Sequence, residues 1–161
     1  MTIRKAEERD VPRITEIYNQ AVAKTTATFD TEPRSLEDRL SWFEKHGPKH
    51  PVLVADDGGR ILGWASLSHW SDRAAYDASV EISVYVEEGM RGKGIGRALM
   101  EAVVAEAHAL RHHTILARIT ADNPVSIHLH EALGFSNAGT VREVGFKFGR
   151  WLDVVTMQIM L

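Results

Sequence analysis

The chain has 161 residues, of which 44% are hydrophobic and 25% charged, as is typical of one ordinary globular domain. It carries 19 Lys and Arg against 22 Asp and Glu, a net charge of −3 that gives no overall attraction to nucleic acid or anionic membranes. Cysteine is absent, which excludes disulfides, thiolate metal sites and a cysteine nucleophile, and no stretch approaches the ~18 apolar residues of a membrane span. We therefore expect a single cytoplasmic domain over residues 1–161, without a nucleic-acid or membrane partner.

The first elements are a strand over residues 2–6 and an amphipathic helix. Asp10 can cap this helix and Pro12 suits its first turn. Apolar side chains then follow at helical spacing, which predicts a face turned toward a core: Ile14, Ile17, Tyr18, Ala21 and Val22.

A second helix and a hairpin come next. The segment "SLED" at 35–38 has the pattern of a capping box, and the inner face predicted for this helix consists of Leu36, Leu40 and Phe43. Residues 52–55 and 60–70 read as two strands, because the glycine-containing turn "DDGG" separates them.

Residues 79–87 alternate between two faces, as a strand does. Valine and isoleucine occupy one face, and the other face carries Glu81, Ser83 and Tyr85. A long helix is predicted from about Gly94 to Leu110, followed by a strand over 114–120.

The C-terminal part contains one more helix and two strands. Asn123 and Pro124 are good first residues for a helix that ends at Gly134, and the strands lie near 136–146 and 152–160. The element order is β-α-α-β-β-β-α-β-α-β-β, which predicts an α/β fold with a mixed sheet and helices on both faces.

The segment from Arg91 to Arg97 predicts an anion site. Three glycines alternate with other residues at the start of a helix, so backbone N–H groups can face a ligand without obstruction by Cβ atoms. The helix dipole and the charges of Arg91, Lys93 and Arg97 favour a phosphate or pyrophosphate. Neither G-x-G-x-x-G nor G-x-x-x-x-G-K-[ST] is present, so a dinucleotide fingerprint and a P-loop are excluded.

Several motifs carry a resemblance to a known family. The run Arg91-Gly92-Lys93-Gly94-Ile95-Gly96 after a strand resembles the coenzyme-binding loop of the GCN5-related N-acetyltransferases (GNAT). "NPVSIHLHEALGF" (123–135) is similar to the family's N-x-x-S-x-x-x-[YH]-x-x-x-GF helix, and the element order is also the family's. Within the family, "TFDTEP", "AYDASVEISVYV" and "VGFKFGRWLDV" resemble phosphinothricin and methionine sulfoximine acetyltransferases. The resemblance implies a mostly antiparallel GNAT-type sheet and a homodimer.

The resemblance implies acetyl-CoA as co-substrate, with no metal. It places the pyrophosphate on residues 91–97 and lays the pantetheine arm along Val84, Tyr85 and Val86, where two strands of the sheet separate. Asn123 and Ser126 would bind the pantetheine or the 3′ region; the alternative for Asn123 is plain helix capping.

Amine acetylation also needs proton transfer, and the resemblance offers two residues for it. Glu81 is the expected general base; the alternative is a carboxylate that pairs with a nearby arginine or faces solvent. His130 shares a helix face with Asn123 and Ser126 and is the expected acid; the alternative is a packed, hydrogen-bonded histidine.

The expected acceptor is a small amino acid of the phosphinothricin or methionine sulfoximine type. Arg73 is the candidate for its carboxylate, because arginine suits bidentate carboxylate binding; the alternative is a solvated loop arginine. The expected walls of this pocket are Phe29, Trp70 and Tyr76. The alternatives are another amine (a polyamine, an aminoglycoside or a protein N-terminus) or an acyl-CoA-binding module without catalysis.

Histidines near the end of the long helix raise the question of a metal. His108 and His112 are four residues apart and His113 follows, but no H-E-x-x-H signature or nearby carboxylate completes a ligand set. We expect a solvated helix end and no metal.

Overall fold

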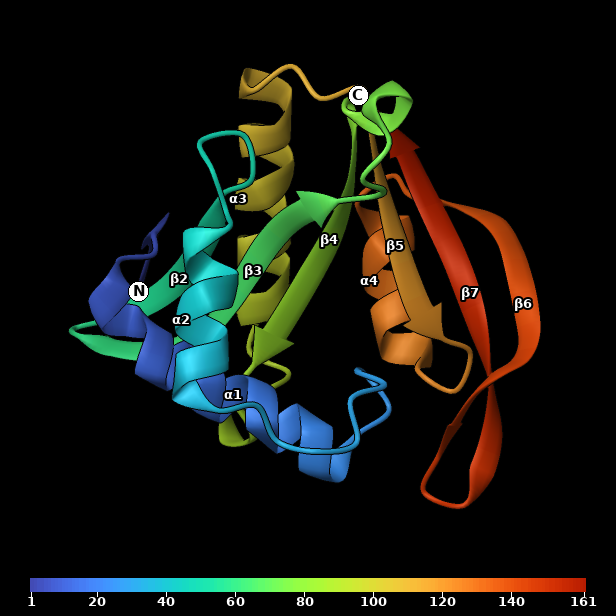
Figure 1. Cartoon of the computed structure of the whole chain (residues 1–161), viewed down its shortest axis with the longest axis horizontal. Helices are drawn as coiled ribbons and strands as arrows, with labels where there is room; N and C mark the ends of the chain where they lie inside the picture. Colours follow the sequence, from blue (N-terminus) through green and yellow to red (C-terminus); the bar gives the residue numbers. More distant parts are fainter.

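The computed structural model describes all 161 residues and contains one seven-stranded sheet of order β1-β2-β3-β4-β5-β7-β6 (Figure 1). The strands are β1 (Thr2–Lys5), β2 (Val52–Asp57), β3 (Arg60–His69), β4 (Ser79–Val86), β5 (Thr114–Thr120), β6 (Ser136–Lys147) and β7 (Arg150–Met160). Every neighbouring pair is antiparallel except β4 and β5. The predicted mixed, mostly antiparallel sheet is confirmed.

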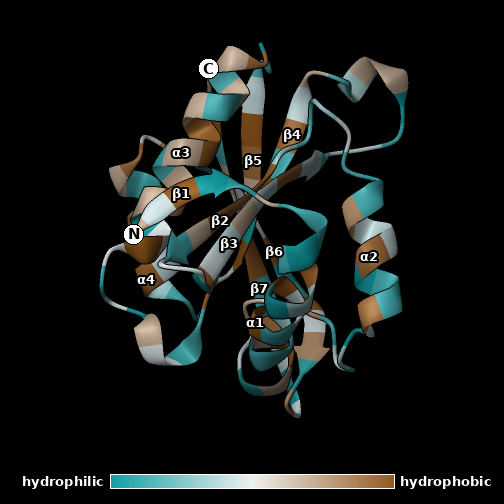
Figure 2. Cartoon of the chain, turned by 90° about the vertical axis from the view of Figure 1, so that its left-hand side faces the viewer, coloured by the Kyte–Doolittle hydropathy of each residue, from teal (hydrophilic) through white to brown (hydrophobic).

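Two helices cover each face of the sheet. The helices are α1 (Val11–Lys24), α2 (Leu36–Glu44), α3 (Ile95–Ala109) and α4 (Pro124–Ala132), and short 3-10 turns occur at η1 (Glu8–Asp10), η2 (Ala74–Tyr76) and η3 (Glu88–Met90). One core lies between α3, α4 and the sheet, and a smaller one between α1, α2 and the other face. In Figure 2 the helices carry both apolar and polar residues, as expected of helices with one buried side. None of the helices is both long enough and apolar enough to cross a lipid bilayer.

The start of α1 differs from the expectation. Asp10 makes no side-chain cap to α1; its carboxylate accepts the N–H of Glu7 and forms an ion pair with Arg4. Asp10 therefore closes the 3-10 turn η1, which leads into α1. Pro12 lies in the first turn of α1 as expected, and one of the two bonds of the expected capping box at 35–38 is present, since the Ser35 side chain accepts the N–H of Asp38.

The predicted inner face of α2 is confirmed only for Phe43, which packs against the smaller core, whereas Leu36 and Leu40 do not. The other inward side chains are Arg39, which is 6% exposed, and Trp42, whose ring centroid lies 3.7 Å from the Arg39 guanidinium carbon. Arg39 also lies over the rings of Tyr18 and Trp64, at 4.6 and 5.5 Å. The attraction of this cation for three aromatic faces turns the helix, so Leu36 is 45% exposed.

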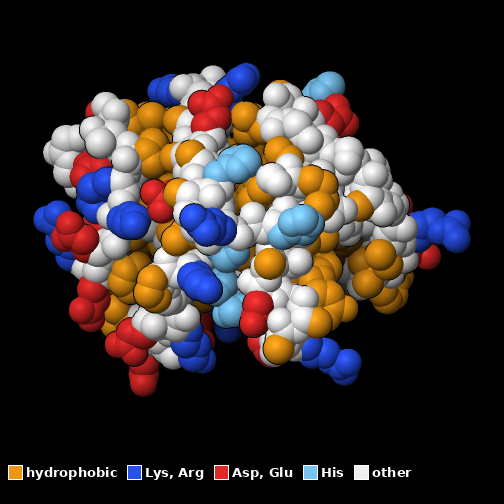
Figure 3. All heavy atoms as spheres, turned by 90° about the horizontal axis from the view of Figure 1, so that it is seen from above, with side chains coloured by type: hydrophobic (Ala, Val, Ile, Leu, Met, Phe, Trp, Pro, Cys, Tyr) orange, Lys and Arg blue, Asp and Glu red, His pale blue; other side chains and the backbone are white.

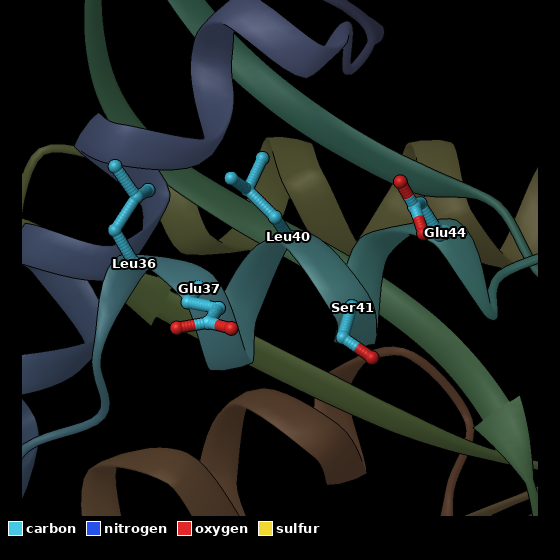
Figure 4. A pocket seen from close by; sticks show the side chains of 5 residues that line it. All are labelled: Leu36, Glu37, Leu40, Ser41 and Glu44. Atoms are coloured by element: carbon cyan, nitrogen blue, oxygen red, sulfur yellow. The ribbon is translucent and has the colours of Figure 1, made fainter.

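A surface depression results along the outer side of α2 (Figure 4). It is lined by residues of this helix alone: Leu36, Glu37, Leu40, Ser41 and Glu44. Since one helix surface supplies every lining residue and no second element encloses a ligand, we do not assign the reaction to it.

The strands β4 and β5 separate after a short parallel contact. They pair only from Ser79 to Glu81 on β4, against Thr114 to Leu116 on β5. Beyond this point β4 keeps β3 on one edge as far as Val86, whereas its other edge has no strand beside it. The backbone from Ile82 to Val86 is therefore free to pair with an extended ligand.

Candidate active site

The turn before α3 has the backbone that its glycines predict. Gly92 and Gly94 have φ values of +76° and +82°, which L side chains rarely adopt. A Cβ built on either residue would meet no atom within 4 Å, so the space beside the turn is open. Gly96 follows in the first turn of α3, next to Val86 of β4 and Leu129 of α4.

The same turn leaves a set of hydrogen-bond donors free. The backbone N–H groups of residues 91–97 donate to no acceptor in the protein; the N–H of Ala98 is the first to bond, to the carbonyl of Gly94. Arg91, Lys93 and Arg97 are exposed around them, and Arg97 also pairs with Glu101 at 2.9 Å. Free N–H groups, the positive end of a helix and cations together form a site for a phosphate-bearing ligand.

The free edge of β4 continues this site toward the middle of the sheet. Val84 and Val86 pack against the core beneath α3, whereas Tyr85 points to the opposite face against Trp64 and Tyr18. The Tyr85 hydroxyl donates to the carbonyl of Ala27 at 3.3 Å, and burial raises its pKa. Tyr85 thus connects β4 to the loop between α1 and α2.

The helix α4 borders the opening from the α3 side. Asn123 caps it by accepting the N–H of Ser126 at 3.2 Å, so the capping alternative holds, and its amide group stays available. His130 is 6% exposed, and its ring lies edge-on to Phe135. Its Nδ1 lies 2.7 Å from the carbonyl oxygen of Ser126.

This contact fixes the tautomer of His130. A carbonyl oxygen can only accept, so Nδ1 carries the hydrogen and the neutral ring presents Nε2 as an acceptor. Burial lowers the pKa of His130, which favours this neutral form. The ring can donate from Nε2 only when it is a charged imidazolium.

Glu81 lies where β4 and β5 part, and it is paired with Arg118, which belongs to none of the sequence motifs. Arg118 of β5 donates from Nε and Nη2 to the two carboxylate oxygens, at 2.5 and 2.8 Å. The pair raises the pKa of Arg118. The side chain of Glu81 is 18% exposed and that of Arg118 is 57% exposed, so the carboxylate is held beneath an accessible guanidinium.

The alternation of apolar and polar residues along β5 indicates the face on which Arg118 lies. Ile115, Ala117 and Ile119 are buried on one face, which leaves Arg118 on the other, the side to which Glu81 also points. The identity of its partner depends on the short parallel register between β4 and β5, which cannot be read from either segment alone.

The loop between β3 and β4 brings one predicted wall to Glu81. The ring of Trp70 lies 5.2 Å from the guanidinium carbon of Arg118, so Trp70, Arg118 and Glu81 form one group. Arg73 and Tyr76 are exposed in the same loop, at and within η2, and Arg73 forms no ion pair. The structure places Arg73 near this group in the chain but in contact with none of its members.

Phe29 lies where the loop after α1 meets the β6–β7 hairpin. Its ring occupies the space next to Gly145, where a Cβ would overlap it. Lys147, 4% exposed, donates to the carbonyl of Thr28 at 2.8 Å, and burial lowers its pKa. The hairpin therefore holds the loop that carries Phe29.

Histidine side chains gather at the end of the molecule where β3 ends and β4 begins (Figure 3). The ring of His50 lies 3.9 Å from that of His69 and 5.8 Å from that of His112. His112 is 6% exposed and its Nε2 lies 2.7 Å from the carbonyl oxygen of Lys49, so the expectation that it belongs to a solvated helix end is wrong. No group of three or more metal-ligating side chains is arranged to hold an ion.

The arrangement as a whole fits acetyl-CoA. The free N–H groups of 91–97 suit its pyrophosphate, and the open edge of β4 suits the amide-bearing pantetheine. Glu81 lies at the last paired position before β4 and β5 separate, on the face of β4 opposite to Val84 and Val86.

Comparisons with known proteins agree with this geometry. The family model of the acetyltransferase (GNAT) domain matches residues 3–156. An L-methionine sulfoximine/L-methionine sulfone acetyltransferase of Pseudomonas aeruginosa is 43% identical over 99% of this chain and 94% of its own. A phosphinothricin N-acetyltransferase of Alcaligenes faecalis is 37% identical over 98% of this chain and 81% of its own.

A solved structure is similar over the whole chain. An acetyltransferase from Salmonella typhimurium, determined with its cofactor acetyl-CoA, superimposes with a TM-score of 0.97 at 41% identity. The superposition covers 100% of this chain and 94% of the other.

Proposed function

Because the chain belongs to the GNAT family of acetyltransferases, we propose that it acetylates the α-amine of a small amino-acid-like acceptor. It is an acetyl-CoA-dependent N-acetyltransferase of the phosphinothricin and methionine sulfoximine type. The observation that carries the proposal is the opening between β4 and β5, with a phosphate-binding turn on one side and the carboxylate of Glu81 on the other. This geometry brings an acyl donor and an amine together across the sheet.

The coenzyme site extends over the turn, β4 and α4. Residues 91–97 hold the pyrophosphate through free backbone N–H groups and through the charges of Arg91, Lys93 and Arg97. Val84, Tyr85 and Val86 pair with the pantetheine, and the free amide of Asn123 and the hydroxyl of Ser126 complete its contacts. When bound, acetyl-CoA supplies the thioester whose carbonyl carbon is attacked.

Glu81 is the proposed general base. An α-ammonium group must lose a proton before its nitrogen can attack, and a carboxylate at the opening is placed to accept it. The ion pair with Arg118 holds the carboxylate in one orientation. The acceptor ammonium would approach the side of Glu81 that this guanidinium leaves open.

His130 enters the reaction as a neutral hydrogen-bonding group. Its Nδ1 is occupied by Ser126 and burial opposes a charged ring, so the structure argues against a proton donor at neutral pH. A departing thiolate needs little help, because thiols are far more acidic than amines. We assign Nε2 the role of an acceptor that orients the coenzyme or the attacking amine.

The acceptor pocket is formed by the loop between β3 and β4 together with the loop after α1. Arg73 is exposed and without an ion pair, so it can bind the α-carboxylate of the acceptor. The proposed apolar walls of this pocket are Trp70, beside Arg118, together with Tyr76 and Phe29.

A homodimer is part of the proposal. The β6–β7 hairpin extends beyond the helices (Figure 1) and exposes apolar side chains, among them Phe146 at 56% and Trp151 at 62%, whose rings lie 5.0 Å apart. A second copy of the chain would cover this surface. Light scattering tests it: twice the chain mass of 18.0 kDa supports the dimer, and a single chain mass contradicts it.

An amine screen tests the proposed reaction. The release of free thiol from acetyl-CoA can be followed with a thiol-reactive dye, and the protein adds no background because it has no cysteine. Amino acids should react, whereas a panel in which only polyamines, aminoglycosides or peptide N-termini react would contradict the proposed acceptor.

A further inference from the structure

We propose that Arg118 binds an acidic group on the side chain of the acceptor, so that the enzyme selects α-amino acids with an anionic side chain over those with a neutral one. This inference rests on the proposed function, because it names the substrate class of the same site.

The first support is the way in which Arg118 is bonded. Only Nε and Nη2 donate to Glu81, at 2.5 and 2.8 Å, and Nη1 has no partner in the protein. A guanidinium has five N–H donors in one plane, so the edge formed by Nη1 and the second hydrogen of Nη2 stays free for another oxyanion. Carboxylates and phosphinates have two oxygens at the spacing that such an edge accepts.

The second support is that the side chain of Arg118 is accessible to a ligand and yet held in one position. The side chain of Arg118 is 57% exposed, so a ligand can reach it, yet Glu81 and the ring of Trp70 restrict its position. An exposed arginine without such neighbours would lose side-chain entropy on binding a ligand. The ion pair with Glu81 and the ring of Trp70 already restrict the side chain of Arg118, so this entropy loss on ligand binding is smaller.

The third support is the pattern of charge. Arg118 pairs with Glu81 from β5, and the proposed function adds Arg73, in the loop before β4, as the cation for the α-carboxylate, so the proposed acceptor site contains one carboxylate and two cations. An α-amino acid with a neutral side chain offers one ammonium and one carboxylate, which leaves one cation without a ligand. An acceptor with an additional anionic group matches all three charges.

Two acceptors separate the alternatives, since they have similar length and differ in side-chain charge. Phosphinothricin carries a negatively charged phosphinate, whereas methionine sulfone carries a neutral sulfone with two oxygens. Steady-state acetylation of both should be measured with the wild type, Arg118→Gln and Arg118→Lys. The matched control is Arg9→Gln, because Arg9 is also exposed and also ion-paired, to Glu7 at 2.7 Å, but lies in η1.

We expect wild-type kcat/KM to be higher for phosphinothricin. Arg118→Gln should lower kcat for both acceptors by a similar factor, because Glu81 loses the pair that orients it, and should in addition raise KM about 10- to 50-fold for phosphinothricin but not for methionine sulfone. Arg118→Lys should lie between, because it keeps the charge and loses the two-point contact. Arg9→Gln should match the wild type, and all variants should bind acetyl-CoA equally, which shows that they are folded.

Equal losses of kcat/KM for both acceptors in Arg118→Gln would overturn the inference, since Arg118 would then only orient Glu81. Unchanged kinetics, or a wild type that prefers the sulfone, would overturn it as well. Each of these results leaves acetyl transfer to an amino acid intact. A wild type that acetylates no amine would instead contradict the proposed function itself.

Discussion

The carboxylate of Glu81 on β4 and the guanidinium of Arg118 on β5 are joined by two hydrogen bonds, of 2.5 and 2.8 Å, beside the point where the two strands separate. The residues are 37 positions apart in the chain and meet because β4 and β5 pair in parallel over three residues. This pair fixes the orientation of a carboxylate at the point where β4 and β5 separate.

Replacing Glu81 by glutamine should remove the base and keep the shape of the side chain. We expect kcat to fall by ~10²–10⁴ with little change in the affinity for acetyl-CoA, because the carboxylate acts on the amine. Glu16→Gln is the matched control, since Glu16 also pairs with an arginine, on the exposed side of α1. If Glu81→Gln retains the wild-type rate and pH–rate profile, another group accepts the proton.

Replacing Gly94 by valine should abolish coenzyme binding. A branched side chain would occupy the open space beside the free N–H groups, where the phosphates must approach. Gly59→Val is the matched control: Gly59 also has a positive φ, +96°, and open space around it, but lies in the β2–β3 turn. Both variants carry similar backbone strain, so titration calorimetry with acetyl-CoA should show loss in Gly94→Val alone. Equal affinities in the two folded variants would remove the pyrophosphate from this turn.

Replacing His130 by phenylalanine should have a modest effect. The ring is buried beside Phe135, its Nδ1 is occupied and burial lowers its pKa, which favours the neutral form. We expect kcat to fall about tenfold or less, with the alkaline limb of the pH–rate profile unchanged. A fall of more than about a hundredfold together with loss of that limb would instead identify His130 as the proton donor.

Replacing Arg73 by alanine should weaken the binding of the amino acid and leave acetyl-CoA unaffected. The loss of one partner from a carboxylate–guanidinium contact should raise KM for the acceptor about tenfold or more. The control is the matching amide of the acceptor, whose KM is already high in the wild type and should change little in Arg73→Ala. Equal KM values for acid and amide in the wild type would show that the carboxylate is not bound.

The histidines near the ends of β3 and α3 should make stability depend on pH. Burial lowers the pKa of His50 from the usual 6.5 to about 4, with the charges of His69 and His112 as further causes. Between these pH values the unfolded chain binds a proton that the folded chain excludes, so the free energy of unfolding falls as pH drops from 7 to 5. The loss should be on the order of 1–3 kcal/mol. Thermal unfolding of His50→Phe should show a smaller decrease over this range; equal slopes for both proteins would contradict the assignment.

The strands and helices could be predicted largely from the sequence because local signals agree with the final packing. The range 114–120 matches β5, and the cap and proline at 123–124 begin α4. The inward position of Arg39 on α2 could not be predicted, because the aromatic rings that hold it come from α1 and β3 as well as from α2 itself. Hydrophobic periodicity assigns apolar residues to the buried face of a helix, so it does not predict a buried arginine.

The candidate site was only partly predictable for the same reason. The turn at 91–97 is a local feature, and its glycine conformations follow from its residues. Arg118, the tautomer of His130 and the burial of His112 depend on contacts with residues that are distant in the chain or with backbone atoms. Such partners become defined only once the sheet register is known.

The most direct test of the proposed reaction is mass spectrometry of the product formed from acetyl-CoA and an α-amino acid, with thiol release measured in the same sample. We predict that thiol release depends on the amino acid, that the acetyl group is on its α-nitrogen, and that both fall together in Glu81→Gln. Thiol release that is independent of the amino acid, or acetylation of simple amines with the amino acid unmodified, would contradict the account.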